Sequence, residues 1–136
     1  EIEEEAGMTI SAIFEREGET GFRGREARML DRITSERGGA VVSTGGGAPA
    51  MPDSAAMLRE RCLCAWLHVS PARAAARAKA ATRPLLAGKD PEATLAALQE
   101  SRRGAYAACA HMVVSSDELE SREVAEVIHE EIDRAS

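Results

Sequence analysis

Residues 41–47, with the sequence VVSTGGG, constrain the fold of this chain more than any other stretch. Val and Thr suit a pleated backbone that is packed on both faces, so residues 41–44 predict a short buried strand. Ligands of open α/β sheets bind outside the carboxyl ends of the strands, and glycines there let a ligand lie directly on main-chain N–H groups. Gly45, Gly46 and Gly47 are therefore candidate ligand-binding residues. A tight turn without a ligand would explain the three glycines equally well if they stood alone.

Helical patterns alternate with short apolar runs on both sides of this stretch, which is typical of α/β proteins. Two more strands are expected at residues 64–69 and 111–115. Glycine- or proline-punctuated loops are expected at residues 21–26 and 80–90. Helices are expected at residues 1–6, 10–17, 27–37, 52–58, 71–79, 91–106 and 121–134. A chain of 136 residues suits one domain, so the sequence predicts a single α/β domain over residues 1–136, with three α/β/α layers and a parallel sheet.

Composition excludes several classes of partner. The net charge of -6 argues against non-specific nucleic-acid binding, because such binding needs a basic face. No apolar run approaches the ~18 residues of a membrane span, so no membrane partner is expected. The three cysteines, Cys62, Cys64 and Cys109, do not make up a zinc-binding set. We therefore expect these cysteines to be reduced thiols in a cytoplasmic protein.

Most of the 17 basic residues are arginines, and four of them stand at unusual positions. Arg23 follows an aromatic residue in a glycine-flanked loop, and Arg83 precedes Pro-Leu-Leu. Arg77 lies in an alanine-rich helix, and Arg102 lies one helical turn before a tyrosine. The planar guanidinium group suits bidentate recognition of carboxylates and phosphates. Any one of these arginines alone is typical of a surface charge, but together with the glycine triplet they indicate an anion-binding site.

Four motifs, in order and with matching spacings, resemble those of the shikimate kinase family over nearly all 136 residues. They are Gly18-Glu19-Thr20-Gly21-Phe22-Arg23 with Glu26, Ser43-Thr44-Gly45-Gly46-Gly47-Ala48, Arg83-Pro84-Leu85-Leu86, and Arg102 with Tyr106. The resemblance implies the three-layer parallel α/β architecture of P-loop kinases that resemble nucleoside monophosphate kinases. It also implies a small-molecule kinase that transfers the γ-phosphoryl group of ATP to the 3-hydroxyl of shikimate. The product, shikimate 3-phosphate, would serve the chorismate route to aromatic amino acids.

The resemblance also assigns roles on the substrate side. Arg23 and Arg102 would grip the substrate carboxylate through forked, charge-assisted hydrogen bonds. The glycines of residues 45–47 would let the ring and its hydroxyls approach the main chain. Glu26 would orient Arg23 from behind.

On the nucleotide side, the resemblance assigns residues 80–92 to a lid that carries Arg83. Arg83 would close over ATP and meet the charge on the transferring phosphoryl group, and Arg77 would flank the nucleotide. ATP and Mg²⁺ are the expected cofactors, shikimate and ATP are the expected small-molecule partners, and a monomer is expected.

No G-x-x-x-x-G-K-[ST] motif occurs in the chain. The family places this P-loop, its first strand and an acidic substrate ligand upstream of the point that corresponds to Glu1. We therefore expect an N-terminally truncated chain. The residue that holds Mg²⁺ would lie outside it, this chain would supply no metal ligand, and the chain alone would be inactive.

Two other readings stay open on the residues themselves. One is another small P-loop kinase that acts on a sugar acid, which a substrate panel would separate from shikimate phosphorylation. The other is a non-catalytic binding or regulatory domain of the same fold, which the sequence upstream of Glu1 would reveal.

Overall fold

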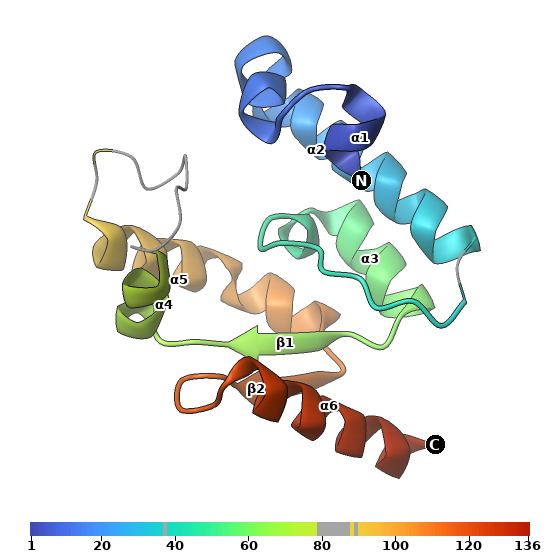
Figure 1. Ribbon diagram of the computed structural model, residues 1–136, viewed down its shortest axis with the longest axis vertical. Coiled ribbons are helices and arrows are strands. Elements are labelled where there is room, and N and C mark those ends of the chain that lie inside the picture. The colour runs from blue at the N-terminus through green and yellow to red at the C-terminus, as the bar shows by residue number, and fades with distance from the viewer. Residues whose placement is uncertain (37, 79–87, 89) are drawn as a thin grey trace. The chain divides into compact units, whose positions relative to one another are not determined.

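The computed structural model describes residues 1–36, 38–78, 88 and 90–136. It contains two compact units, residues 1–62 and residues 63–136 (Figure 1). The first unit is helical and carries the glycine triplet. The second unit contains the strands.

The helices of the first unit are α1 (Ile2–Ala6), α2 (Ile10–Glu36) and α3 (Pro52–Arg61), with a short 3₁₀ turn, η1 (Ala48–Ala50). As predicted, α1 ends at Gly7, which has a φ of 67° and donates its N–H to the carbonyl of Glu3. The side chain of Thr9 accepts the N–H of Ala12 at 3.2 Å and begins α2. Local chain chemistry therefore sets these boundaries.

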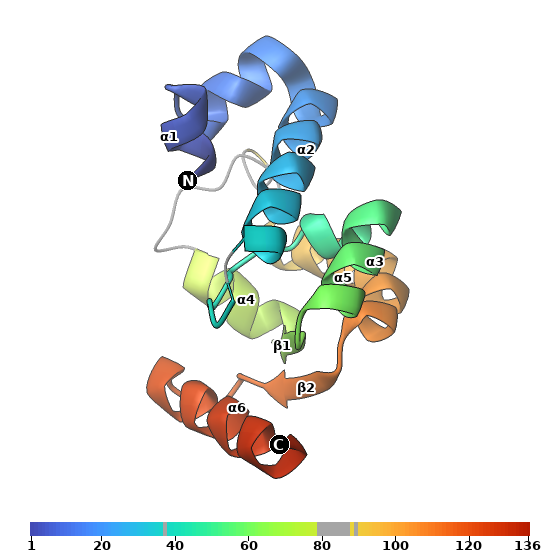
Figure 2. The same cartoon turned by 90° about the vertical axis from the view of Figure 1, so that its right-hand side faces the viewer.

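In the first unit, α2 lies beside α1 and α3 (Figure 2) and also contacts η1. Ile13 is fully buried, and Leu30 and Leu58 are nearly so. Ion pairs join Arg32 to a carboxylate of α1 and Arg61 to a carboxylate of α2, at 3.0 and 2.8 Å. Exposed pairs of this kind contribute at most about 1 kcal/mol, so apolar burial is the main stabilising term.

The loop predicted at residues 21–26 is wrong, because α2 continues through it. Gly18 interrupts the helix with a φ of 69° and a ψ of -176°, and helical backbone resumes directly afterwards. Arg25 donates two hydrogen bonds to the carboxylate of Glu17 across this kink, at 2.7 and 3.0 Å. These bonds lower the pKa of Glu17. Glycine in the pattern thus marks a kink rather than a loop.

Gly21 is the second glycine that the kink requires. A Cβ atom at Gly21 would overlap with the Cβ of Glu17, which the kink brings close, whereas a Cβ at Gly24 would meet only a guanidinium nitrogen of Arg28, at 3.5 Å. Two glycines of the same helix therefore differ in what they tolerate.

We expect Gly21→Ala to lower the free energy of unfolding by about 1–3 kcal/mol, the usual cost of overpacking. Gly24→Ala is the matched control and should be neutral or stabilising by up to about 1 kcal/mol, because alanine favours a helix. Urea unfolding of both variants measures the difference. Equal stability of the two would show that the kink does not depend on close approach at Gly21.

The strand predicted at residues 41–44 is also wrong. These residues belong to no helix and to no ladder, and the side chain of Val41 is fully exposed. A strand exists only through pairing with a neighbour, and within the described ranges the ladder joins two strands of the other unit. β-Branched residues alone do not make a strand where no partner lies alongside.

The second unit contains the parallel pair β1 (Ala65–His68) and β2 (Met112–Ser115), together with α4 (Pro71–Ala78), α5 (Pro91–Cys109) and α6 (Ser121–Ala135). The register pairs Ala65 with Met112, Trp66 with Val113, Leu67 with Val114 and His68 with Ser115. Strands at both predicted places, and their parallel direction, are confirmed.

Helices cover this small sheet. The rings of Trp66 on β1 and Tyr106 on α5 meet edge to face, with centroids 5.6 Å apart. The side-chain amide of Gln99 donates to the carbonyl of Val69, at the end of β1, at 2.7 Å. Beside β2 lies α6, where Val124 is buried (Figure 1). These contacts hold α5 at a defined position along β1.

No helix within the described ranges is long and apolar enough to cross a membrane.

Candidate functional site

Arg23 lies on the second half of α2 and is largely buried, with only 13% of its side chain exposed. Its Nη1 donates to Oε1 of Glu26 at 2.8 Å, one helical turn further along. Glu26 is buried as well. A buried guanidinium with a charged partner at hydrogen-bond distance is rigidly held, because leaving either charge without its partner would be costly. The contact between Arg23 and Glu26 that the family resemblance implies is present.

Two further side chains support Arg23. Its guanidinium lies over the ring of Phe22, with 5.1 Å between Cζ and the ring centroid, and Phe22 packs on Phe14 with centroids 4.8 Å apart. On its other side, Nη2 lies 3.6 Å from a carboxylate oxygen of Glu19. Glu19 was not among the residues expected at the site, because a loop was predicted at residues 21–26 and an i,i+4 spacing brings side chains together only on a helix.

The glycine triplet forms the turn between residues 40–44 and η1. Gly45 has a φ of 71°, which favours glycine, and a Cβ added there would meet no atom within 4 Å. Gly47 instead has an ordinary φ of -86° and caps η1, and its carbonyl accepts the N–H of Ala50 at 3.1 Å. The space beside Cα of Gly45 therefore holds no other atom of the described residues, although no strand precedes this turn.

A Cβ at Gly47 would overlap with Cζ and both terminal nitrogens of Arg23. The guanidinium therefore lies directly against the main chain of the glycine turn. The structure brings Arg23, Glu26 and the turn of residues 45–47 together in one small region of the first unit.

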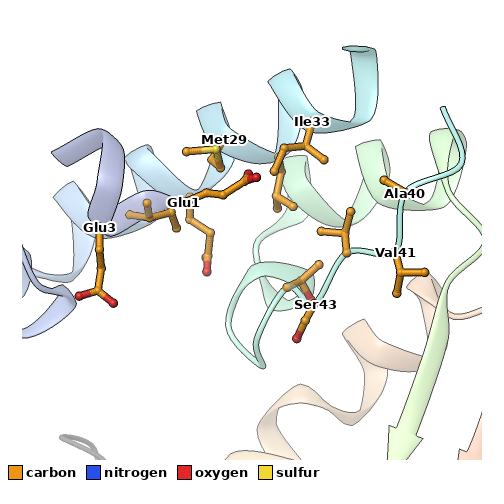
Figure 3. A pocket seen from close by; sticks show the side chains of 12 residues that line it. Glu1, Glu3, Met29, Ile33, Ala40, Val41 and Ser43 are labelled. Carbon is orange, nitrogen blue, oxygen red and sulfur yellow. The ribbon is translucent and has the colours of Figure 1, made fainter. Parts of the chain in front are cut away.

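A hollow of about 360 Å³ lies beside this region (Figure 3). Met29 and Ile33 of α2 line one side, and Ala40 and Ser43, which follow α2 in the chain, line the other (Figure 3). Among the residues that the structure describes, the charged side chains that line it are glutamates, including Glu26. These carboxylates would repel an anionic ligand. The region around Arg23 and residues 45–47 is therefore the better candidate for an anion site.

Arg102 lies on α5 in the second unit and is half-buried, one turn before Tyr106. Among the residues that the structure describes, none forms a hydrogen bond or ion pair with its side chain. Its neighbour Arg103 differs, because it is 65% exposed and lies 3.5 Å from Glu100. Arg102 thus keeps its donors available within the described part of the chain.

Arg77 lies near the end of α4 and donates to both the hydroxyl and the carbonyl oxygen of Ser116. Ser116 in turn donates its N–H to the carbonyl of His68 at 2.8 Å, just beyond the paired strands. Nearby, Asp117 accepts the backbone N–H of Ser70 at 2.7 Å, and this bond lowers the pKa of Asp117. Arg77 therefore stabilises the chain at the carboxyl end of the sheet through its hydrogen bonds to Ser116. Its position in the sequence did not predict this contact.

Arg83 and most of the predicted lid, residues 80–92, lie outside the described residues. The last part of that stretch is helical: Asp90 caps α5 by accepting the N–H of Glu92 at 3.1 Å. Within the described ranges, no cluster of His, Cys, Asp and Glu could hold a metal ion.

Comparisons with known proteins identify the family of this chain. The family model described as shikimate kinase matches residues 1–133. A shikimate kinase of Burkholderia thailandensis is 44% identical over 85% of this chain and 63% of its own length. One of Marinomonas sp. is 42% identical over 98% of this chain and 74% of its own length. The chain thus spans a little under two thirds of the first of these relatives.

Solved structures agree. The shikimate kinase of Acinetobacter baumannii, solved in complex with shikimate, matches with a TM-score of 0.92 and 34% identity, over 99% of this chain and 75% of that one. The enzyme of Bacteroides thetaiotaomicron matches with a TM-score of 0.87 and 30% identity, over 97% of this chain and 79% of that one. These neighbours confirm the predicted fold class, the parallel α/β fold of P-loop kinases. The chain belongs to the shikimate kinase family.

Proposed function

We propose that this chain forms the substrate-binding part of an enzyme that transfers the γ-phosphoryl group of ATP to the 3-hydroxyl of shikimate. The observation that supports this most is the arginine of the Phe-Arg-x-x-Glu motif, which is buried against Glu26 and lies on the glycine turn. Shikimate carries a carboxylate and a hydroxylated ring. A rigidly held guanidinium beside open main chain offers complementary partners for both.

Each residue has a distinct part in this proposal. Arg23 binds the substrate carboxylate, and Glu26 fixes the plane of its guanidinium so that little rotamer entropy is lost on binding. The main chain of residues 45–47 lies beside the ring. Arg102 supplies a second cation for the carboxylate.

On the nucleotide side, Arg83 meets the charge on the transferring phosphoryl group. ATP, when bound, supplies that group and phosphoryl transfer then depends on positioning and charge stabilisation. Arg77 flanks the nucleotide from the carboxyl end of the sheet. Mg²⁺ would be held by a P-loop residue, and no P-loop motif occurs in these 136 residues.

The same proposal covers the setting of the enzyme. It acts as one domain in the cytoplasm, as a monomer with small-molecule partners. Its product, shikimate 3-phosphate, enters the chorismate route to aromatic amino acids.

The direct test is an assay of a full-length version that carries a P-loop upstream of Glu1. We expect ATP-dependent consumption of shikimate and a product heavier by one phosphoryl group, measured by coupled ADP release and mass spectrometry. Residues 1–136 alone should show no turnover, because no backbone cradle and lysine would hold the β- and γ-phosphates. Turnover of another sugar acid in preference to shikimate would contradict the proposal, as would a full-length protein without a P-loop.

Arg102 can be tested against its own neighbour. In the full-length version, Arg102→Ala should weaken shikimate binding about 10- to 150-fold, which corresponds to the loss of one charge-assisted hydrogen bond of about 1.5–3 kcal/mol. Arg103→Ala is the matched control and should change affinity less than about threefold, since its side chain is exposed and its ion pair weak. Titration calorimetry measures both. Equal effects of the two variants would remove Arg102 from the site.

A further inference from the structure

Gly47 differs from Gly45 in the reason for which it is a glycine. The φ of 71° at Gly45 excludes most side chains by backbone strain alone. The φ of -86° and ψ of -32° at Gly47 are open to any residue. Backbone conformation therefore does not require a glycine at position 47.

What requires it is the guanidinium of Arg23. A single methyl group at position 47 would occupy the space of Cζ, Nη1 and Nη2 of that side chain. The guanidinium is the far end of a flexible side chain, so it would move rather than the backbone. Any such movement would separate Arg23 from Oε1 of Glu26, now 2.8 Å away, and from the ring of Phe22.

We infer that Gly47 is a positioning residue, which sets where the guanidinium of Arg23 presents its remaining donors to the substrate carboxylate. This inference rests on the proposed function for its consequence in binding, but its structural half stands on the packing of Gly47 and Arg23 alone. Gly47 leaves room for the guanidinium because it has no side chain, and Glu26 holds the guanidinium through its hydrogen bond. Together, Gly47 and Glu26 determine where the guanidinium of Arg23 lies.

The inference predicts which ligand group the substitution affects. In the full-length version, Gly47→Ala should raise the dissociation constant for shikimate about 30-fold or more, as expected when a buried charged contact is lost. Binding of the neutral carboxamide analogue of shikimate should change less than about threefold, because that ligand has no carboxylate for Arg23. Gly38→Ala is the control, since its added Cβ would meet no atom within 4 Å, and it should leave both affinities unchanged. Equal weakening of both ligands by Gly47→Ala would instead assign Gly47 to direct main-chain contact and overturn the inference.

A thermal-melting cycle tests the structural half without any ligand. Gly47→Ala should lower the melting temperature by about 2–8 °C when Arg23 is present, and by much less in an Arg23→Ala background, because two residues in contact are not additive. An equal loss in both backgrounds would overturn the inference. If the parent protein bound no shikimate, the proposed function would fail while this cycle would still decide whether Gly47 positions Arg23.

Discussion

In a full-length version of the protein, Arg23→Ala should abolish measurable shikimate binding and leave ATP binding nearly intact. The side chain of Arg23 is 13% exposed and is paired with a buried carboxylate, so its contact with a ligand is made in a largely desolvated setting. Loss of one partner of such a charge pair costs about 2–5 kcal/mol, which is roughly 30- to several-thousand-fold in affinity. Titration calorimetry with each substrate measures the effect.

Arg23→Ala also leaves Glu26 buried without its partner, so part of any loss could come from a damaged fold. The double variant Arg23→Met with Glu26→Gln removes both charges and keeps the volume. It should melt closer to the parent than Arg23→Ala does, yet still fail to bind shikimate. Arg28→Ala, a change at an exposed arginine of the same helix, is the control for surface charge. A change in shikimate affinity below threefold in both Arg23 variants would remove Arg23 from the site.

Arg83→Ala should act mainly on turnover in the same full-length version. A cation that meets the transferring phosphoryl group is worth around 10³–10⁵ in rate in related chemistry. We therefore expect kcat to fall by about that factor, while the affinity for shikimate changes little. Steady-state kinetics with saturating ATP and shikimate measures kcat.

Two further variants sharpen this prediction. Arg83→Lys keeps the charge but loses the planar fork, so it should recover part of the rate if charge matters more than bidentate geometry. Lys89→Ala, which removes a cation from the same predicted lid stretch, should keep kcat within tenfold of the parent. If Arg83→Ala also stays within tenfold, Arg83 is an ordinary surface charge.

Local signals predicted the parts of the fold that local chemistry determines. The helices expected to end at residue 6 and to begin at residues 10 and 91 do so. A few consecutive residues set each boundary: the left-handed Gly7, the cap at Thr9 and the cap at Asp90. Short apolar runs at β1 and β2 were also sufficient, because each of these runs has the other as its partner. The pairing of Arg23 with Glu26 came from the family resemblance instead, because residues 21–26 were expected to form a loop and a spacing of three brings side chains together only on a helix.

The wrong predictions of secondary structure concern residues whose conformation depends on contacts outside their own segment. Residues 41–44 have the composition of a strand, but pairing is a property of two segments and these residues have no partner within the described ranges. A loop was predicted where three glycines lie within seven residues, at Gly18, Gly21 and Gly24. Their helix resumes after the kink because Gly21 admits the Cβ of Glu17 and Arg25 bonds to that residue across the break.

The candidate site divides in the same way. Residue types and order in the sequence, together with the family resemblance, predicted Arg23, Glu26 and the glycine triplet as its components. Only the tertiary structure decided that Gly47 lies against the guanidinium of Arg23, and that Arg77 donates to Ser116 at the end of the sheet. The physical reason is that caps, spacings and turn chemistry act over one or two turns of chain, whereas close approach and strand pairing depend on residues brought together by folding.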